Sequence, residues 1–190
     1  MSVRIAPIAP PQAAAYNALV KRGLREHPTA FDSDLAQVAN RSNWQTARSL
    51  RRLNPNNAVL LGAFDPSDRL VGTGMIVRRG GMKQAHCADV LFVYVPIEHQ
   101  GQGIAKQIMT ALIAAARALP GIVQLQLTVN LNGGAAPALY QSLGFQSIGV
   151  LPRAVCVAGD YFDQAQMWLP FDANSDVEVA SESSNSAVAN

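Results

Sequence analysis

The sequence predicts a single domain of the α/β (α+β) class with a mixed sheet. One strand–helix–strand unit lies within a largely antiparallel arrangement. Three strand-like runs follow one another at residues 59–64, 70–78 and 88–95, and the turn residues between them are typical of an antiparallel meander. A long amphipathic helix then separates the third run from a further strand at 124–129. The 190 residues, 49% of them hydrophobic, are in the range of one domain with one core.

The N-terminal third is predicted to contain one strand followed by helices. Residues 3–8 alternate weakly between apolar and polar side chains and indicate the strand. Pro10-Pro11 then precedes a helix whose apolar residues recur at helical spacing, and His27-Pro28 ends it. Residues 34–53 are compatible with one further helix or a broken pair, which the turn-forming residues 54–57 end.

The C-terminal half is predicted to contain two more helices and the remaining strands. From Gly103 onward, apolar residues recur at helical spacing until Pro120-Gly121 stops the helix. After the next strand, a short helix over 135–143 leads to closing strands at 145–150 and 161–169.

Composition excludes several functional classes. Residues 172–190 are rich in Ser, Asn, Ala and acidic residues and contain no Lys or Arg, which predicts a disordered acidic tail behind a domain at 1–171. The formal net charge of +2 is too small to indicate nucleic-acid binding. Cys87 and Cys156 give no disulfide framework, and no apolar run approaches the roughly 20 residues that a bilayer span needs. We therefore expect a cytoplasmic protein that binds neither nucleic acid nor membrane.

Residues 93–105 contain the strongest functional signal of the chain. A β-branched strand runs directly into a turn that contains Gly101 and Gly103, and this turn opens the long helix. The first N–H groups of a helix have no intrahelical partner and lie at the positive end of the helix dipole, so a diphosphate can bind there. The two glycines remove the Cβ atoms that would keep an anion away from this backbone. The sequence therefore predicts a phosphate-binding loop.

Two motifs resemble those of the GCN5-related N-acetyltransferase (GNAT) superfamily. The cofactor loop of that family reads Gln or Arg, two residues, Gly, one residue, then Gly or Ala, and the matching residues here are Gln100, Gly103 and Ala105. A second family motif, Leu-Tyr followed by Gly-Phe, corresponds to residues 139–145. The two motifs lie on the expected elements in the expected order, and the resemblance spans roughly residues 3–170.

The resemblance implies a GNAT-like acyl-CoA N-acyltransferase fold with acetyl-CoA as co-substrate. In that fold the strand that ends at Val95 and the strand at 124–129 are parallel and splay apart around the pantetheine arm, while the glycine loop receives the diphosphate. Asn132 would replace the asparagine that the family often has at the position of Gly133. The implied cofactor-binding residues are Val93, Tyr94, Val95, Gln100, Gly101, Gln102, Gly103, Ile104, Ala105 and Asn132.

Acetyl transfer to an amine also needs a group that takes a proton from the amine and a group that gives one to the departing thiolate. Tyr140 is the expected acid, because a phenol with a pKa of about 10 stays protonated at neutral pH. The alternative for Tyr140 is a core aromatic residue. Asp89, six residues before Val95 on the strand that flanks the cleft, is the expected general base. The alternatives are a purely structural Asp89 and His86 as the base.

We therefore expect an N-acetyltransferase that transfers the acetyl group of acetyl-CoA to a primary amine of a small molecule or amino acid by direct attack in a ternary complex. The alternatives are a protein amino-group acetyltransferase and a non-catalytic acyl-CoA-binding sensor domain. Asp32 and Asp34, near Phe31, weakly indicate a cationic acceptor. No metal site is expected, because the cluster at 86–89 has no second group to complete a tetrahedron. Homodimer formation is left open.

Overall fold

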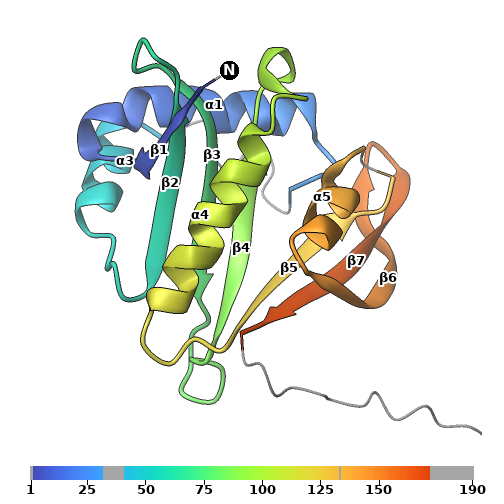
Figure 1. Cartoon of the computed structure of the whole chain (residues 1–190). Helices are drawn as coiled ribbons and strands as arrows, with labels where there is room; N and C mark the ends of the chain where they lie inside the picture. The colour runs from blue at the N-terminus through green and yellow to red at the C-terminus, as the bar shows by residue number, and fades with distance from the viewer. Residues whose placement is uncertain (1, 32–40, 133, 172–190) are drawn as a thin grey trace, which may run out of the picture.

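The computed structural model describes residues 2–31, 41–132 and 134–171 and contains a seven-stranded sheet in the order β1-β2-β3-β4-β5-β7-β6 (Figure 1). Neighbouring strands are antiparallel except for β4 and β5, which are parallel. This arrangement confirms the predicted mixed α/β class. The strands are β1 (Arg4–Pro7), β2 (Ala58–Phe64), β3 (Leu70–Arg78), β4 (Cys87–Tyr94), β5 (Gln124–Asn130), β6 (Gln146–Val157) and β7 (Asp160–Pro170).

Helices cover both faces of the sheet, and each face has its own apolar core. On β2, Leu60 and Phe64 belong to the core beneath α1 and α3, whereas Leu61 and Ala63 belong to the core beneath α4. This alternation is expected of a strand that is buried on both faces. The helices are α1 (Ala13–Glu26), α3 (Asn43–Arg51), α4 (Ile104–Ala118) and α5 (Ala136–Ser142), with single turns of 3-10 helix at η1 (Pro10–Gln12) and η2 (Ile97–His99). None of these helices is both long and apolar enough to cross a bilayer.

The helix predicted within residues 34–53 is present as α3 and begins at a capping box. The Ser42 hydroxyl accepts a hydrogen bond from the Gln45 backbone N–H at 3.2 Å, and the Gln45 side chain accepts one from the Ser42 N–H at 2.9 Å. The Thr46 hydroxyl donates to the side-chain oxygen of Asn17 at 2.7 Å and holds α3 against α1. Residues 34–40 of this prediction and the predicted tail at 172–190 lie outside the described residues.

Helix α4 lies close to the sheet because β3 has glycines beneath it. A Cβ atom on Gly72 would lie 3.0 Å from the Ile108 side chain, and one on Gly74 would lie 2.9 Å from Ile108 and Leu112. The Ile108 and Leu112 side chains are fully buried. The position of α4, and of the turn from which it begins, is therefore fixed by tight packing on the sheet.

Strands β4 and β5 pair over three residues and then separate. Their register runs from Cys87 opposite Gln124 to Asp89 opposite Gln126. Beyond this point β4 contains a bulge at Phe92, which has a φ of 49°. The parallel strand pair that splays apart, which the family resemblance implied, is therefore present.

The last hairpin is longer than predicted. Strand β6 spans Gln146–Val157 rather than 145–150, and it continues past a register shift between Leu151 and Val155. Ala158 and Gly159 both have positive φ values, 51° and 94°, and they form the tight connection to β7. The irregular stretch around Arg153, whose φ is also positive, obscures the alternation that would have marked the second half of β6.

Candidate active site

The two splayed strands border a cavity with a volume of about 810 Å³. Its wall is formed by the ends of β4 and β5, the loop that opens α4, the helix α5 and the segment that follows α1. The sequence-predicted site residues that line it are Val93, Tyr94, Val95, Gln100, Gly101, Gly103, Ile104, Ala105, Asn132 and Tyr140. The structure therefore brings together two motifs that are about 40 residues apart in the sequence.

The loop before α4 presents uncovered backbone N–H groups to the cavity. Gly101 and Gly103 have φ values of 72° and 73°, and no heavy atom would lie within 4 Å of a Cβ atom on either residue. Gly103 is the N-cap of α4, and no side chain caps this helix. The first helical hydrogen bond is donated by Gln107 to the Gly103 carbonyl. The N–H groups of residues 104–106 are consequently free of intrahelical partners, as an anion site requires.

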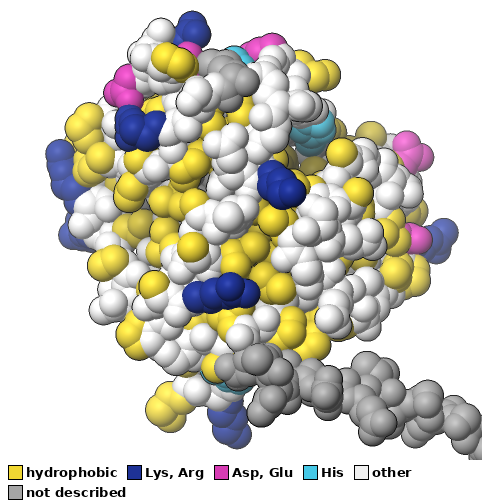
Figure 2. Space-filling view, in the orientation of Figure 1, with side chains coloured by type: hydrophobic (Ala, Val, Ile, Leu, Met, Phe, Trp, Pro, Cys, Tyr) yellow, Lys and Arg dark blue, Asp and Glu magenta, His cyan; other side chains and the backbone are white. Residues whose placement is uncertain are grey.

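Charge around this helix start also favours an anion. The first turn of α4 contains no acidic residue and carries Lys106, which lines the cavity. In the middle of the face that carries α4, Lys and Arg side chains lie singly among apolar and uncharged side chains, and acidic side chains are confined to the margins of the view (Figure 2). The positive charge of Lys106 and the N–H groups without intrahelical partners therefore both favour an anionic ligand at this helix start.

The two glutamines of the loop have different positions. The side chain of Gln100 donates to the Val95 carbonyl at 2.9 Å and fixes the start of the loop to the end of β4. The side chain of Gln102 donates to the Glu98 carbonyl at 3.3 Å, and Gln102 does not line the cavity. Of the cofactor-binding residues predicted from the sequence, Gln102 is therefore the one that the structure places outside the cavity wall.

The end of β4 divides the cavity between the two faces of the sheet. A Cβ atom on Gly74 would meet Val93 together with residues of α4, so Val93 faces α4. A Cβ atom on Gly23 of α1 would lie 3.0 Å from the Tyr94 ring and 3.1 Å from the Phe92 ring, so these aromatic side chains face α1. The phosphate-binding loop and the aromatic residues thus lie towards opposite faces of the sheet.

Tyr140 is held in the wall of the cavity by α5. Its ring packs edge-on against Phe145 at a centroid distance of 5.8 Å, and its side chain is 9% exposed. Burial raises the pKa of Tyr140 to about 12. The phenol therefore stays protonated at neutral pH and retains a proton to donate.

Asn132 and Asn130 connect the end of β5 with the segment after α1. Asn132 lines the cavity, and its backbone N–H donates to the side-chain oxygen of Asn130 at 2.8 Å. The side-chain amide of Asn130 donates to the Thr29 carbonyl at 3.2 Å. Asn130 is 3% exposed, and its two hydrogen bonds fix the cavity wall across the gap between the splayed strands.

Asp89 and His86, the two bases considered from the sequence, lie outside this cavity. The Asp89 carboxylate forms an ion pair with Arg79 at 2.7 Å, in the part of β4 that still pairs with β5. His86 is exposed in the turn before β4. The position of Asp89 six residues before Val95 places it upstream of the point at which the strands separate, so the structure lends no support to Asp89 as the general base.

A carboxylate that sequence reasoning missed, Glu26, lines the cavity at the end of α1. It accepts a hydrogen bond from the Tyr94 hydroxyl at 2.6 Å and one from the Arg22 guanidinium at 2.6 Å. These two donors, Tyr94 first, hold the pKa of the Glu26 carboxyl below its usual value. Glu26 is therefore ionised at neutral pH, and its side chain remains 29% exposed at the cavity rim.

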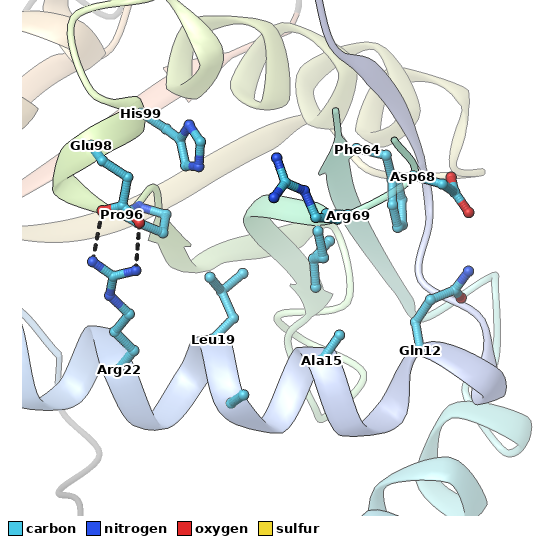
Figure 3. A pocket seen from close by; sticks show the side chains of 12 residues that line it. Gln12, Ala15, Leu19, Arg22, Phe64, Asp68, Arg69, Pro96, Glu98 and His99 are labelled. Carbon is cyan, nitrogen blue, oxygen red and sulfur yellow. Dashed lines mark hydrogen bonds and ion pairs between the residues drawn. The ribbon is translucent and has the colours of Figure 1, made fainter. Parts of the chain in front are cut away.

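Arg22 connects Glu26 to the loop that leads to the phosphate-binding turn. Its two terminal nitrogens donate to the two carboxylate oxygens of Glu98, each at 2.6 Å (Figure 3). This pairing lowers the pKa of Glu98 to about 2. The ion pair also forms part of the wall of a second, smaller cavity of about 520 Å³ between α1 and the segment after β4.

Within residues 2–31, 41–132 and 134–171, no cluster of three His, Cys, Asp or Glu side chains has the arrangement of a metal site. The polar groups of the cavity are therefore backbone amides, two phenols, two imidazoles, amide and hydroxyl side chains, one ammonium and one carboxylate.

Comparison with known proteins identifies one family and many solved structures with a similar fold. The model of the acetyltransferase (GNAT) family matches residues 22–145. No curated protein sequence gives a significant match. A GNAT-family acetyltransferase from Streptococcus pneumoniae has 24% sequence identity to this chain and a TM-score of 0.79, with 89% of this chain and 99% of that chain covered.

Two further solved structures share the fold. A GNAT-superfamily phosphinothricin acetyltransferase from Sinorhizobium meliloti, in complex with acetyl-CoA, has a TM-score of 0.78 at 17% identity, over 90% of this chain and 89% of that chain. A ribosomal-protein-alanine N-acetyltransferase from Brucella melitensis has a TM-score of 0.72 at 21% identity, over 88% of this chain and 99% of that chain.

Proposed function

The chain belongs to the acetyltransferase (GNAT) family, and from that premise we propose that it transfers the acetyl group of acetyl-CoA to a primary amine of a small molecule or an amino acid. The main support for this proposal is the cavity between β4 and β5. Its wall contains the uncapped start of α4, the protonated phenol of Tyr140 and the ionised carboxylate of Glu26.

The cavity has the features that a nucleotide thioester requires. The N–H groups at the start of α4 would bind the diphosphate, and Lys106 adds a positive charge in the same turn. The backbone of Val93 and Val95, beyond the last residue pair with β5, would bind the pantetheine arm in the way a neighbouring strand would. A structure of the fold in complex with acetyl-CoA, the Sinorhizobium meliloti enzyme, supports this choice of co-substrate.

Two side chains are proposed to move the protons. Acetyl-CoA supplies a thioester carbonyl, to which the amine nitrogen bonds while the carbon–sulfur bond breaks. Tyr140 donates its phenolic proton to the departing sulfur. Glu26 holds the substrate ammonium and accepts its first proton, whose loss frees the nitrogen lone pair for attack, and passes that proton to solvent. The second proton, which the nitrogen loses as the amide forms, returns through solvent to the Tyr140 phenolate. Glu26 takes the role that the sequence assigned to Asp89, because Glu26 lines the cavity and Asp89 does not.

The proposal is tested by pairing Tyr140→Phe with the matched control Tyr161→Phe, since Tyr161 is an exposed residue of β7. We expect Tyr140→Phe to lower kcat by roughly 100-fold or more, the usual contribution of a general acid. The affinity for acetyl-CoA should stay within about twofold of wild type. Thiol release reports turnover, and calorimetry reports binding.

Each alternative gives a different result in this assay. Unchanged turnover in Tyr140→Phe would assign the proton donor elsewhere. Binding of acetyl-CoA without thiol release for any amine would indicate the non-catalytic sensor. Turnover only with polypeptide acceptors would indicate a protein acetyltransferase, an activity that the Brucella melitensis neighbour's name carries. Absence of any thermal shift with acetyl-CoA would remove the co-substrate itself from the proposal.

A further inference from the structure

We propose that the acceptor is a primary amine on an apolar body of aromatic size that has no carboxylate of its own. This inference rests on the proposed function and narrows its acceptor class. It follows from which side chains face α1 in the cavity and from the charges that they carry.

The α1 side of the cavity has an aromatic wall. Phe31 stacks on Phe92 with ring centroids 4.3 Å apart and an interplanar angle of 26°. Phe92 is followed by Tyr94 at 6.2 Å, and Tyr94 by His27 at 6.1 Å. The bulge in β4 places Phe92 in this row, and all four rings line the cavity. Such a wall favours an apolar group with a flat face.

One carboxylate lies beside this aromatic wall. Glu26 is the only acidic side chain among the described residues that line the cavity, and the Tyr94 hydroxyl orients it. A carboxylate next to aromatic faces suits an alkyl ammonium group, which gains both an ion pair and cation–π contacts. The acceptor amine is therefore recognised in its charged form before it loses a proton.

Among the described residues that line the cavity, no Lys or Arg side chain lies beside Glu26 to receive a carboxylate on the same substrate, and the basic rings of the wall are those of His27 and His99. Lys106, the only Lys or Arg among the described residues that line the cavity, belongs to the first turn of α4 at the phosphate-binding side. Arg22 lies near Glu26, but its donors are already shared between Glu26 and Glu98.

An amino acid acceptor is consequently disfavoured. The α-carboxylate is separated from the amine by a single carbon atom, so it would enter the cavity beside Glu26. There it would meet the like charge of Glu26 and would lose hydration, with no Lys or Arg of the described lining beside it to compensate. The same molecule without the carboxylate avoids both costs.

The test compares phenethylamine, phenylalanine and phenylalaninamide as acceptors, with each rate divided by the unprotonated fraction of that amine at the assay pH. We expect kcat/KM for phenethylamine to exceed that for phenylalanine by at least about 10-fold, the cost of one unpaired charged group. Phenylalaninamide has the size of phenylalanine without its charge, and it should be accepted nearly as well as phenethylamine. Glu26→Gln should reduce the preference for phenethylamine over phenylalanine and leave acetyl-CoA affinity unchanged.

The outcomes separate this inference from the proposed function. Equal use of phenylalanine and phenethylamine would overturn the inference while acetyl transfer stands. Strong preference for a peptide with N-terminal phenylalanine, assayed as a fourth acceptor, over the three small amines would overturn it in favour of a polypeptide acceptor. If acetyl-CoA binds and no acceptor releases thiol, the proposed function itself fails, and the inference fails with it. A Glu26→Gln variant that binds acetyl-CoA but keeps the full preference would remove Glu26 as its cause.

Discussion

A substitution at Gly103, with Gly121 as its matched control, tests the phosphate-binding loop most directly. The two glycines flank the same helix, both have a φ of 73°, and a Cβ atom on either would have no heavy atom within 4 Å. Changing either residue to Ala forces an L residue into the left-handed region, which costs roughly 1–2 kcal/mol. For a chain of this size, each variant should therefore melt about 2–8 °C below wild type.

Binding of acetyl-CoA should distinguish the two variants. Gly103 lines the cavity at the start of α4, whereas Gly121 lies beyond the other end of the helix and does not line it. A methyl group on Gly103 would occupy the open space in front of the first N–H groups. Loss of one hydrogen bond to a charged phosphate costs about 1.5–3 kcal/mol, which corresponds to roughly a 10- to 100-fold rise in Kd.

Calorimetric titration of each variant with acetyl-CoA, together with its melting curve, provides the measurement. We expect equal losses of Tm and a rise in Kd for Gly103→Ala alone. Equal Kd values for the two variants would refute the reasoning, because backbone strain would then account for every effect. A rise in Kd for Gly121→Ala would likewise show that strain, and not the position in the cavity, governs binding.

Two further substitutions test the α1 side of the molecule. Gly23→Ala should raise KM for the amine several-fold without changing the Kd of acetyl-CoA, because the added Cβ lies only 3.0–3.2 Å from the Tyr94 and Phe92 rings. Steady-state kinetics measures the first quantity and calorimetry the second. Equal effects on both ligands would contradict this prediction. Arg22→Gln should return the pKa of Glu98 from about 2 towards about 4.3 in an NMR titration, and a pKa that stays near 2 would contradict the assignment of its cause. Since the folded-state pKa is the depressed one, the pair stabilises the fold above about pH 4 and this contribution is lost as the pH falls towards 2.

Local patterns predicted those elements whose boundaries are set by turn residues or helix caps. Strand β3 begins and ends at the predicted residues 70 and 78, because the turn at 65–68 and the residues after Arg78 mark both ends. Helix α4 begins at Ile104 directly after the glycine at 103. The second half of β6 could not be predicted, because the register shift between Leu151 and Val155 and the positive φ of Arg153 interrupt the alternation of its side chains.

The parts of the candidate site that are made of backbone were predictable, and the side chains that come from distant segments were not. Glycine spacing fixes where a helix start is open, so the residues around Gly103 could be named in advance. The number of residues between Asp89 and Val95 does not reveal where β5 separates from β4. The position of this separation decides which carboxylate can reach the cavity.

Glu26 meets Tyr94 across 68 positions of the chain, and no short-range pattern joins them. One local signal was nevertheless available. An acidic residue at the C-terminal end of a helix opposes the helix dipole, and such a departure from a local preference is expected mainly at functional positions.

The three residue pairs between β4 and β5 also make the sheet two sections, of four strands and three, held by a short seam. A co-substrate whose arm hydrogen-bonds the open edges of β4 and β5 would add further bonds between the two sections. The bound ligand would therefore act like an additional strand, present only while it is bound. Bound acetyl-CoA would then stabilise the contact between the two sections, because separating them would also cost the free energy of acetyl-CoA binding. Amide exchange in β4 and β5 would accordingly slow as acetyl-CoA saturates the protein, and the cell's thioester level would set how tightly the two sections hold together.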